Sequence, residues 1–346
     1  MVTAIVTVAC DALPAMDKAG GRADPVTLRM GTRDGPGAPG GRVVREFSRL
    51  VDHLSSGTLR IEPVWNAHGT AVRGWDALIV RRVAEGDLDL ALVATTAWEP
   101  DVAPGLGALQ APFLVDSDRL LEELATPDVA SGLLRDLDTA GMRGLALLPK
   151  GLRHPFSFGR PFRAPADYVR RTIQIPEAAS VVADTLHALR ARPGALGPAE
   201  LRQAAEAGTI AGAAASLRQA SELPLGATAT GNVVLYAEME VIALSHDVLD
   251  ELDEELVDVL TKAAVQTSTW VLTEIVPEAE AAASFCAGGG AIVVASDADL
   301  AALAEAVGPV YESLLGDHRT ADAIARIQAL RRQLPPPPPI EPCGPP

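Results

Sequence analysis

Gly86-Asp87-Leu88-Asp89-Leu90-Ala91-Leu92-Val93, residues 86–93 of the chain, is the stretch that decides the fold class. The mostly apolar run from Leu88 to Val93 is typical of a short strand buried on both faces of a parallel sheet. A helix is predicted just before it, from about Trp75 to Glu85, and Gly86 ends that helix. A strand that follows a helix in this way favours a parallel sheet covered by helices.

The alternation of strand and helix extends to both sides of this stretch. Towards the N-terminus, strands are predicted at 26–31 and 59–64, with a helix at about 42–54 between them. Together with residues 88–93 they complete a β-α-β-α-β order. Beyond Pro112 the pattern predicts helices at about 117–124 and 127–140 and a strand at 145–148.

The same order restarts in the second half and predicts a second α/β unit, from about Gly151 to Tyr236. Its expected strands are 172–175, 195–196 and 209–212, and its expected helices are 178–189 and 198–207.

The last third of the chain returns to the first unit and then leaves it again. A strand is predicted at 241–244, and a long helix begins after the N-cap Asp253 and is kinked by Pro277. A strand at 291–295 and a helix at 299–314 follow. Since the chain crosses between two sheets more than once, the crossings form a hinge that lets two lobes close on a solute.

The length of 346 residues is too great for one compact core and suits two lobes. The expected boundaries place residues 25–150 and 236–280 in the first lobe and residues 151–235 and 281–330 in the second.

The net charge of −16 disfavours two classes of partner. A negative field repels nucleic acid and anionic lipid, so we expect no nucleic acid partner and no membrane contact except through a lipid anchor. No apolar run approaches the roughly 18 residues that a membrane span needs.

The N-terminus resembles a bacterial lipoprotein signal. Residues 1–9 are apolar, and Ala9 precedes Cys10, which would carry lipid as the new N-terminus after cleavage. A basic region is missing, which a true start farther upstream would explain; the alternative is an ordinary N-terminus with a chance cysteine. We expect residues 1–24 to be signal, lipid anchor at Cys10 and tether, and the protein to be extracytoplasmic.

The C-terminus is rich in proline. Residues 331–346 include Pro335 to Pro339, which can form polyproline II but no core, so we expect a disordered tail. The three cysteines contain no CxxC pair, which argues against zinc and dithiol chemistry. Cys286 and Cys343 could pair outside the cell, but a buried free Cys286 is the commoner outcome and the one we favour.

Catalytic and phosphate-binding motifs are absent from the sequence. It contains no GxSxG, HExxH, GxxxxGK[ST] or EF-hand loop. The glycines between Gly31 and Gly41 do not form GxGxxG, and the six histidines show no ligand spacing. We therefore expect no catalytic residue, no metal, no cofactor and no enzymatic activity.

Three segments carry a family resemblance. The first joins residues 86–93 to Gln110-Ala111-Pro112-Phe113-Leu114, and the second joins residues 141–145 to Lys150-Gly151-Leu152-Arg153-His154. The third joins residues 160–167 to Ile173-Gln174-Ile175-Pro176 and residues 200–212. In order and spacing, from about Val26 to Leu314, the chain resembles the solute-binding proteins of tripartite ATP-independent periplasmic (TRAP) transporters, DctP type.

The resemblance implies an α/β, two-lobed fold like that of periplasmic binding proteins, with parallel-type sheets, a hinge and a long bridging helix. It also implies an organic acid held between the lobes, and TRAP membrane permease subunits as partners. No cofactor is implied.

The sequence departs from the family where the ligand would bind. The resemblance implies an arginine that clamps a carboxylate, but Gln174 stands at that position. Ala211 replaces an aspartate, and Ala213 to Ala215 replace polar residues. Gln offers only a neutral donor and acceptor, whereas Arg forms a charged, two-pronged pair. We therefore expect a small organic solute other than a typical C4-dicarboxylate.

The candidate ligand-binding residues come from the resemblance and from strand ends. Arg153 keeps an arginine that in the family also faces the ligand, and alternation along the strand places Gln174 opposite its two isoleucines. Thr95, Thr96 and Trp98 follow the strand at 88–93, where ligands of open parallel sheets bind. Asn232 follows a glycine at the second crossing and is a further candidate.

Three functions remain open from the sequence. The first is a TRAP-type solute receptor, and the second is a ligand-sensing lipoprotein, or a degenerate binding protein, that works without a permease. The third is an enzyme on a binding-protein scaffold, which the missing catalytic motifs disfavour.

Overall fold

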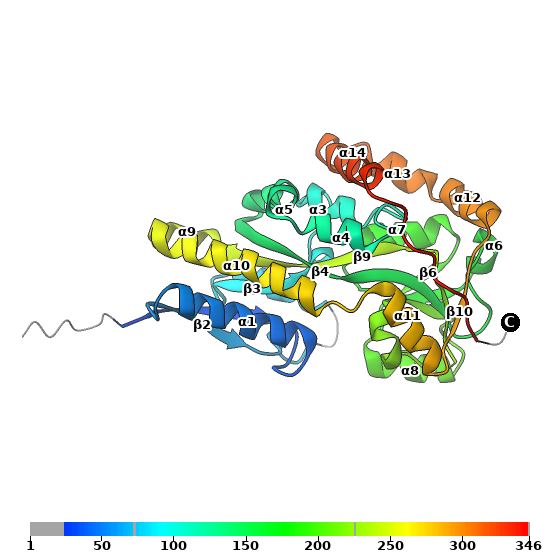
Figure 1. Cartoon of the computed structure of the whole chain (residues 1–346), viewed down its shortest axis with the longest axis horizontal. Helices are drawn as coiled ribbons and strands as arrows, with labels where there is room; N and C mark the ends of the chain where they lie inside the picture. The colour runs from blue at the N-terminus through cyan, green and yellow to red at the C-terminus, as the bar shows by residue number, and fades with distance from the viewer. Residues whose placement is uncertain (1–23, 72–73, 225, 345–346) are drawn as a thin grey trace, which may run out of the picture.

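Two groups of strands, joined through one long strand, organise the computed structural model, which describes residues 24–71, 74–224 and 226–344 (Figure 1). The first sheet has the order β2-β1-β3-β9-β4. Its members are β1 (Val26–Thr32), β2 (Leu59–Val64), β3 (Leu90–Ala94), β4 (Met142–Ser157) and β9 (Tyr236–Ser245). We call the part built on this sheet the first lobe.

The second lobe is built on strands that continue from the far end of β4. They are β5 (Thr172–Gln174), β6 (Arg192–Gly194), β7 (Gly212–Ala215), β8 (Thr228–Thr230) and β10 (Ala291–Val293). Strand β4 pairs with β9 over its first part and with β7 and β8 over its last part. One strand therefore belongs to both lobes.

Strand direction follows the path of the chain between the lobes. Strand β1 is parallel to β2 and β3, and β5 is parallel to β6 and β7, as the strand-helix alternation predicts. Strand β9 pairs antiparallel with β3 and β4, because it carries the chain back from the second lobe to the first. The sheets are therefore mixed, with parallel strands in each lobe.

Strand β4 has 16 residues, far more than the predicted 145–148. Its pairing with β9 shifts register between Gly144 and Ala146 and again between Pro149 and Gly151. Gly151 has φ of 145°, and a Cβ there would lie 2.9 Å from Nη1 of Arg218. Because proline and glycine interrupt the apolar pattern at these irregular positions, the sequence did not predict the full length of the strand.

Helices cover both faces of the first sheet. Leu90 and Leu92 point to a cluster with α1 (Pro39–Leu54) and α10 (Glu254–Glu274). Ala91 and Val93 point to the opposite cluster. That cluster holds residues of α2 (Trp75–Ala84), α3 (Pro104–Leu109), α4 (Asp118–Leu124) and α5 (Pro127–Leu134). This double burial is what the apolar stretch at 86–93 predicts.

The remaining helices are shorter or lie on the second lobe. They are α6 (Pro165–Tyr168), α7 (Ser180–Ala188), α8 (Pro198–Glu206), α9 (His246–Glu251), α11 (Glu278–Ala287), α12 (Asp297–Ala306), α13 (Gly308–Leu314) and α14 (His318–Gln333), with 3₁₀ turns at Thr95–Ala97, Arg135–Ala140 and Leu217–Glu222. Among the described residues, no helix is both long and apolar enough to cross a bilayer.

The long helix ends before Pro277 instead of bending at it. The Asp253 carboxylate caps α10 by accepting a hydrogen bond of 2.9 Å from the Leu256 amide, as predicted. Helix α10 ends at Glu274, the chain extends, and α11 begins at Glu278. Proline lacks an N–H and clashes with the preceding turn, so it breaks the helix here. The extended link passes from the first lobe to the second (Figure 1).

The proline-rich end is part of the fold, whereas the sequence predicted a disordered tail over 331–346. Helix α14 continues to Gln333, and Cys343 forms a disulfide with Cys286 of α11. Cys343 also exchanges backbone hydrogen bonds with Ile292 of β10. Cys286 is therefore not a free thiol, contrary to the outcome that we favoured.

Helix α14 lies against α3 of the first lobe, although the sequence assigned residues 281–330 to the second lobe. The chain then runs from α14 back to β10 of the second lobe (Figure 1). We call residues 334–344 the C-terminal strap.

Candidate functional site

A cleft of about 390 Å³ lies between the two lobes. Arg33 follows the carboxyl end of β1, and Thr96 follows that of β3, which is where ligands of open α/β sheets bind. Lys150, Arg153, Tyr236 and Glu238 of the central strands β4 and β9 line it as well.

Three basic side chains meet one buried carboxylate at the cleft. Glu238 is 3% exposed and forms an ion pair with Arg153. Its Oε1 lies 3.6 Å from Nζ of Lys150 and 3.9 Å from Nη2 of Arg33. The Glu238 carboxylate therefore contacts all three cations.

Further carboxylates complete the partners of these cations. Oε1 of Glu240 lies 2.5 Å from Nζ of Lys150, and Oδ2 of Asp76 lies 3.0 Å from Nη1 of Arg33. Nη1 of Arg153 donates a hydrogen bond of 3.0 Å to Oε1 of Gln219. Each of the three cations therefore has a carboxylate partner within the protein.

The ion cluster controls proton binding at Glu238. Burial alone would raise the pKa of this carboxyl, but the positive charges of Arg153, Lys150 and Arg33 lower it from 4.5 to about 2. Burial likewise disfavours the charged form of Arg33, but its pKa is raised overall because Asp76, Glu238, Glu240 and Asp34 surround it. Both groups are therefore charged at neutral pH.

Acid should destabilise the protein through Glu238. The unfolded chain takes up a proton at this carboxyl below about pH 4.5, whereas the folded protein does so only near pH 2. The unfolded state thus binds more protons in this window. Stability from this group, about 3 kcal/mol by the shift in pKa, is present above pH 4.5 and lost as the pH falls towards 2. Urea unfolding at a series of pH values measures the free energy of unfolding. In Glu238→Gln this free energy should fall less steeply between pH 4.5 and 2 than in wild type. The same pH dependence of the free energy of unfolding in both proteins would show that Glu238 is not its source.

Two buried polar atoms at the cleft have no hydrogen-bond partner among the described residues. They are Oη of Tyr236, a residue that is 1% exposed, and Nε of Arg153. Burial and the nearby Glu238 charge raise the pKa of Tyr236, so its phenol is neutral. Because an unpaired buried polar group is costly, these atoms are suited to hydrogen bonds with a bound molecule.

The second lobe presents a mostly apolar wall to this charged surface. Ala214 and Ala215, the positions where the resemblance implies polar residues, both line the cleft. Leu196, Leu201 and Leu223 lie beside them. The cleft thus joins a charged face and an apolar face, an arrangement that holds and orients a small molecule.

Three of the predicted site residues come together at the cleft. Arg153, Gln174 and Thr96 line it, although they lie on three different elements. Nε2 of Gln174 donates a weak hydrogen bond of 3.5 Å to the carbonyl of Leu196. Motif order predicted the positions of Arg153 and Gln174, and the end of a predicted strand predicted that of Thr96.

The other three predicted residues do not line the cleft. Trp98 is 4% exposed and packs in the main apolar cluster, so it offers no face for stacking. Thr95, three residues earlier in the chain, is fully buried as well. The amide of Asn232 is committed to the backbone of Ala295, through hydrogen bonds of 2.8 and 2.7 Å. Asn232 therefore joins a loop to the segment after β10.

The sequence missed several residues of the cleft. Trp75 is the tryptophan that lines it, and its ring stacks on His68 with centroids 4.7 Å apart. Arg33 was detectable, because it directly follows a predicted strand. Glu238 and Glu240 alternate within an otherwise apolar, buried strand, and charges placed in this way indicate buried ion pairs.

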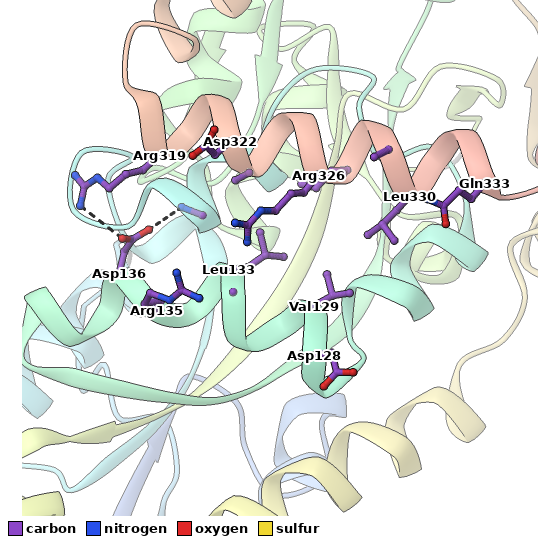
Figure 2. Close-up of a pocket in the computed structure, with 15 residues that line it drawn as sticks. Asp128, Val129, Leu133, Arg135, Asp136, Arg319, Asp322, Arg326, Leu330 and Gln333 are labelled. Carbon is purple, nitrogen blue, oxygen red and sulfur yellow. Dashed lines mark hydrogen bonds and ion pairs between the residues drawn. The ribbon is translucent and has the colours of Figure 1, made fainter.

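A second cavity, of about 460 Å³, lies on the outer face of the first lobe between α5 and α14 (Figure 2). Asp136 bonds to Arg319, 3.5 Å away, and to the Gly105 amide. Its apolar floor includes Leu133 and Leu330. Although larger, it involves no residue of the second lobe and none of the predicted site residues, so the interlobe cleft is the better candidate.

Metal binding receives no support from the described residues. They contain no group of three or more His, Cys, Asp or Glu side chains that could hold a metal ion.

Comparison with known families gives one match over most of the chain. The DctP model, described as bacterial extracellular solute-binding protein, family 7, matches residues 30–317. No protein of curated function matches the chain.

Solved structures share the fold. A TRAP periplasmic solute-binding protein from Ralstonia eutropha, with bound (S)-2-acetolactate, has a TM-score of 0.76 and 20% identity over 89% of this chain and 99% of that one. One from Xanthobacter autotrophicus, with β-D-galacturonate, has a TM-score of 0.74 and 19% identity over 87% and 99%. A sugar acid binding protein from Advenella mimigardefordensis, with galactonate, has a TM-score of 0.71 and 20% identity over 90% and 99%. At such identities the likeness establishes the two-lobed fold and not the ligand.

Proposed function

The chain belongs to the bacterial extracellular solute-binding proteins of family 7, and on that premise we propose that it captures a small organic solute in the interlobe cleft for a TRAP-type permease. The observation that carries this proposal is the cleft itself, where a charged surface of the first lobe faces an apolar wall of the second. Proteins of this family bind solutes outside the cytoplasm without transforming them, so the protein is not an enzyme.

The solute is proposed to differ from a C4-dicarboxylate. The similar proteins hold organic acids such as acetolactate and galacturonate. In this chain Gln174 replaces the arginine that the resemblance implies, and Arg153 is already paired with Glu238. A dicarboxylate would find no uncommitted guanidinium among the described cleft residues.

Closure of the two lobes is part of the proposal. We place the lobes at 25–150 with 236–280 and at 151–235 with 281–330 apart from α14. They are joined by β4, by the start of β9, by the link at 275–277 and by the segments on either side of α14. These few connections allow rotation of one lobe against the other.

Thermal stability should report solute capture. A solute at 100 times its Kd stabilises the folded protein by about 2.7 kcal/mol, which raises Tm measurably. A thermal-shift screen with organic acids, amides, amines, amino sugars, neutral sugars and amino acids should find a ligand, and that ligand should reduce the radius of gyration in small-angle scattering. A saturating ligand that leaves the radius unchanged would contradict closure, and a screen without any ligand would contradict the function.

A lipid anchor at Cys10 is also proposed, although this residue lies outside the described residues. It is supported by the apolar residues 1–9 and the polar stretch that follows. Expressed in a bacterium with a complete signal, the protein should enter the membrane fraction, and Cys10→Ser should release it. The double variant Cys286→Ser with Cys343→Ser serves as the cysteine control and should stay in the membrane fraction. Wild type in the soluble fraction would rule the anchor out.

A further inference from the structure

Among the described residues that line the cleft, carboxylates outnumber cations. The described lining contains five acidic side chains and three basic ones: Asp34, Asp76, Glu177, Glu222 and Glu238 against Arg33, Lys150 and Arg153. Glu240 adds a sixth carboxylate through its pair with Lys150. The excess of negative charge is unexpected in a fold whose similar structures hold organic acids.

All three cations are already neutralised by the protein. Glu238 contacts each of them, Asp76 pairs with Arg33, and Glu240 pairs with Lys150. A carboxylate on the solute would have to displace one of these internal pairs, and it would add charge to a site with an anionic excess. Like charges at close range in a poorly solvated site repel, whereas a cation would be attracted.

Two of the acidic residues that line the cleft, Glu177 and Glu222, are exposed. Neither Glu177 nor Glu222 has an ion-pair partner among the described residues. Glu177 belongs to the second lobe, and its Oε2 would lie 3.6 Å from a Cβ on Gly74 at the start of α2. Its charge therefore interacts with the positive end of that helix. Glu222 ends a 3₁₀ turn of the second lobe and has no such neighbour.

Two buried polar atoms of the cleft need neutral hydrogen-bond partners. Tyr236 and Arg153 are more than nine-tenths buried, line the cleft, and leave Oη and Nε unpartnered. Nε–H of Arg153 requires an acceptor, and the phenol can donate or accept. A hydroxyl group satisfies both without adding charge.

We infer that the solute is a small hydroxylated amine, such as an amino alcohol or amino sugar, whose ammonium group faces the cleft carboxylates while its hydroxyls bond Tyr236 and Arg153. The inference deepens the proposed function and rests on it. Trp75, whose ring lines the cleft, adds a surface on which a cation is also favourable.

Two matched series of probes test the charge of the solute. The short series is glycerate, glycerol and 3-amino-1,2-propanediol; the long series is D-gluconate, D-glucitol and D-glucamine. Within each series only the terminal group changes, from carboxylate to hydroxyl to ammonium. In titration calorimetry at neutral pH, the amine of at least one series should bind about tenfold more tightly than its alcohol, the amount that one charge-assisted hydrogen bond supplies. The acid should bind most weakly.

Substitutions test whether the preference for the amine arises from residues of the cleft. Glu222→Gln should weaken amine binding about two- to fivefold without changing the Tm of the free protein, because Glu222 is exposed and has no described structural partner. Glu305→Gln changes the net charge equally at an exposed position of α12 that does not line the cleft, and should have no effect. Asp76→Asn removes the carboxylate nearest to Arg33, leaves its longer contacts with Glu238 and Asp34, and should move the preference towards the acid of the same series.

The outcomes separate this inference from the function on which it rests. Tighter binding of gluconate or glycerate than of the matched amine would overturn the amine assignment and leave solute capture intact. Absence of binding by both amines would overturn it too, whereas the broad thermal-shift screen decides the function independently. An equal loss in Glu222→Gln and Glu305→Gln would show that net charge, and not the cleft, attracts the amine.

Discussion

Replacing Glu238 by glutamine is expected to lower the free energy of unfolding by about 3–5 kcal/mol, the usual cost of removing one partner from a buried ion cluster. Arg153 would lose its described carboxylate partner, and Lys150 and Arg33 would each lose one of theirs. The side chains of Lys150 and Arg153 are at most 10% exposed, so their charges would stay largely shielded from solvent. The glutamine side chain has the same shape, so packing is preserved and the effect isolates charge.

Urea unfolding followed by circular dichroism measures this change. Glu240→Gln is the matched variant on the same strand and should cost less, because Glu240 contacts Lys150 alone of the three cations. Glu251→Gln on exposed α9 should be close to neutral. A loss of less than about 1 kcal/mol in Glu238→Gln, the size typical of exposed ion pairs, would show that solvent screens the cluster.

Loss of the disulfide is expected to cost about 4 kcal/mol. Cys286 and Cys343 are 57 residues apart in sequence, and cross-linking a loop of that length restricts the unfolded chain by this amount in the chain-entropy model. Replacing both cysteines by serine avoids a stray thiol and should lower Tm. A reductant should lower the Tm of wild type towards that of the double variant and leave the double variant unchanged. Equal Tm values in wild type and double variant would refute the contribution.

The disulfide also has a consequence for lobe movement. It links the C-terminal strap to α11 of the second lobe, and Cys343 pairs through its backbone with Ile292 of β10. Ile340 of the strap packs near Gly231, where a Cβ would lie 3.0 Å from its Cγ2. The other end of the strap leaves α14, which lies on the first lobe. The strap therefore joins the lobes in addition to the central strands, and limits how far they separate.

Local patterns along the chain were enough for most of the fold. The apolar stretch at 86–93 predicted a strand buried between helices, and Leu90 and Ala91 do face opposite clusters. The cap of the long helix at Asp253 was correct, because capping needs only neighbouring residues. Strand β4 was largely missed, since its bulges at Gly144 and Gly151 break the period of two on which the prediction depends.

Part of the cleft could be found from the sequence in the same way. Arg153 and Gln174 were located by motif order, and Thr96 by its place after a strand. The same rule misplaced Trp98, because residues that follow a strand can turn into the core as easily as into a cleft. Asn232 was misplaced because its partner, Ala295, is 63 residues away in sequence.

The sequence by itself determined the order of strands and helices, the two α/β units and the position of the cleft at strand ends, since these follow from residues within a few positions of one another. Only the tertiary structure decided which charges neutralise which. Lys150 of β4 and Glu240 of β9 are 90 residues apart in sequence, and Arg153 of β4 pairs with Glu238 of β9. Such pairs form when β4 and β9 become neighbours in the sheet, so no local pattern reveals that the cations of the cleft are already occupied. The disulfide was decided in the same way, by the return of the C-terminal strap to β10.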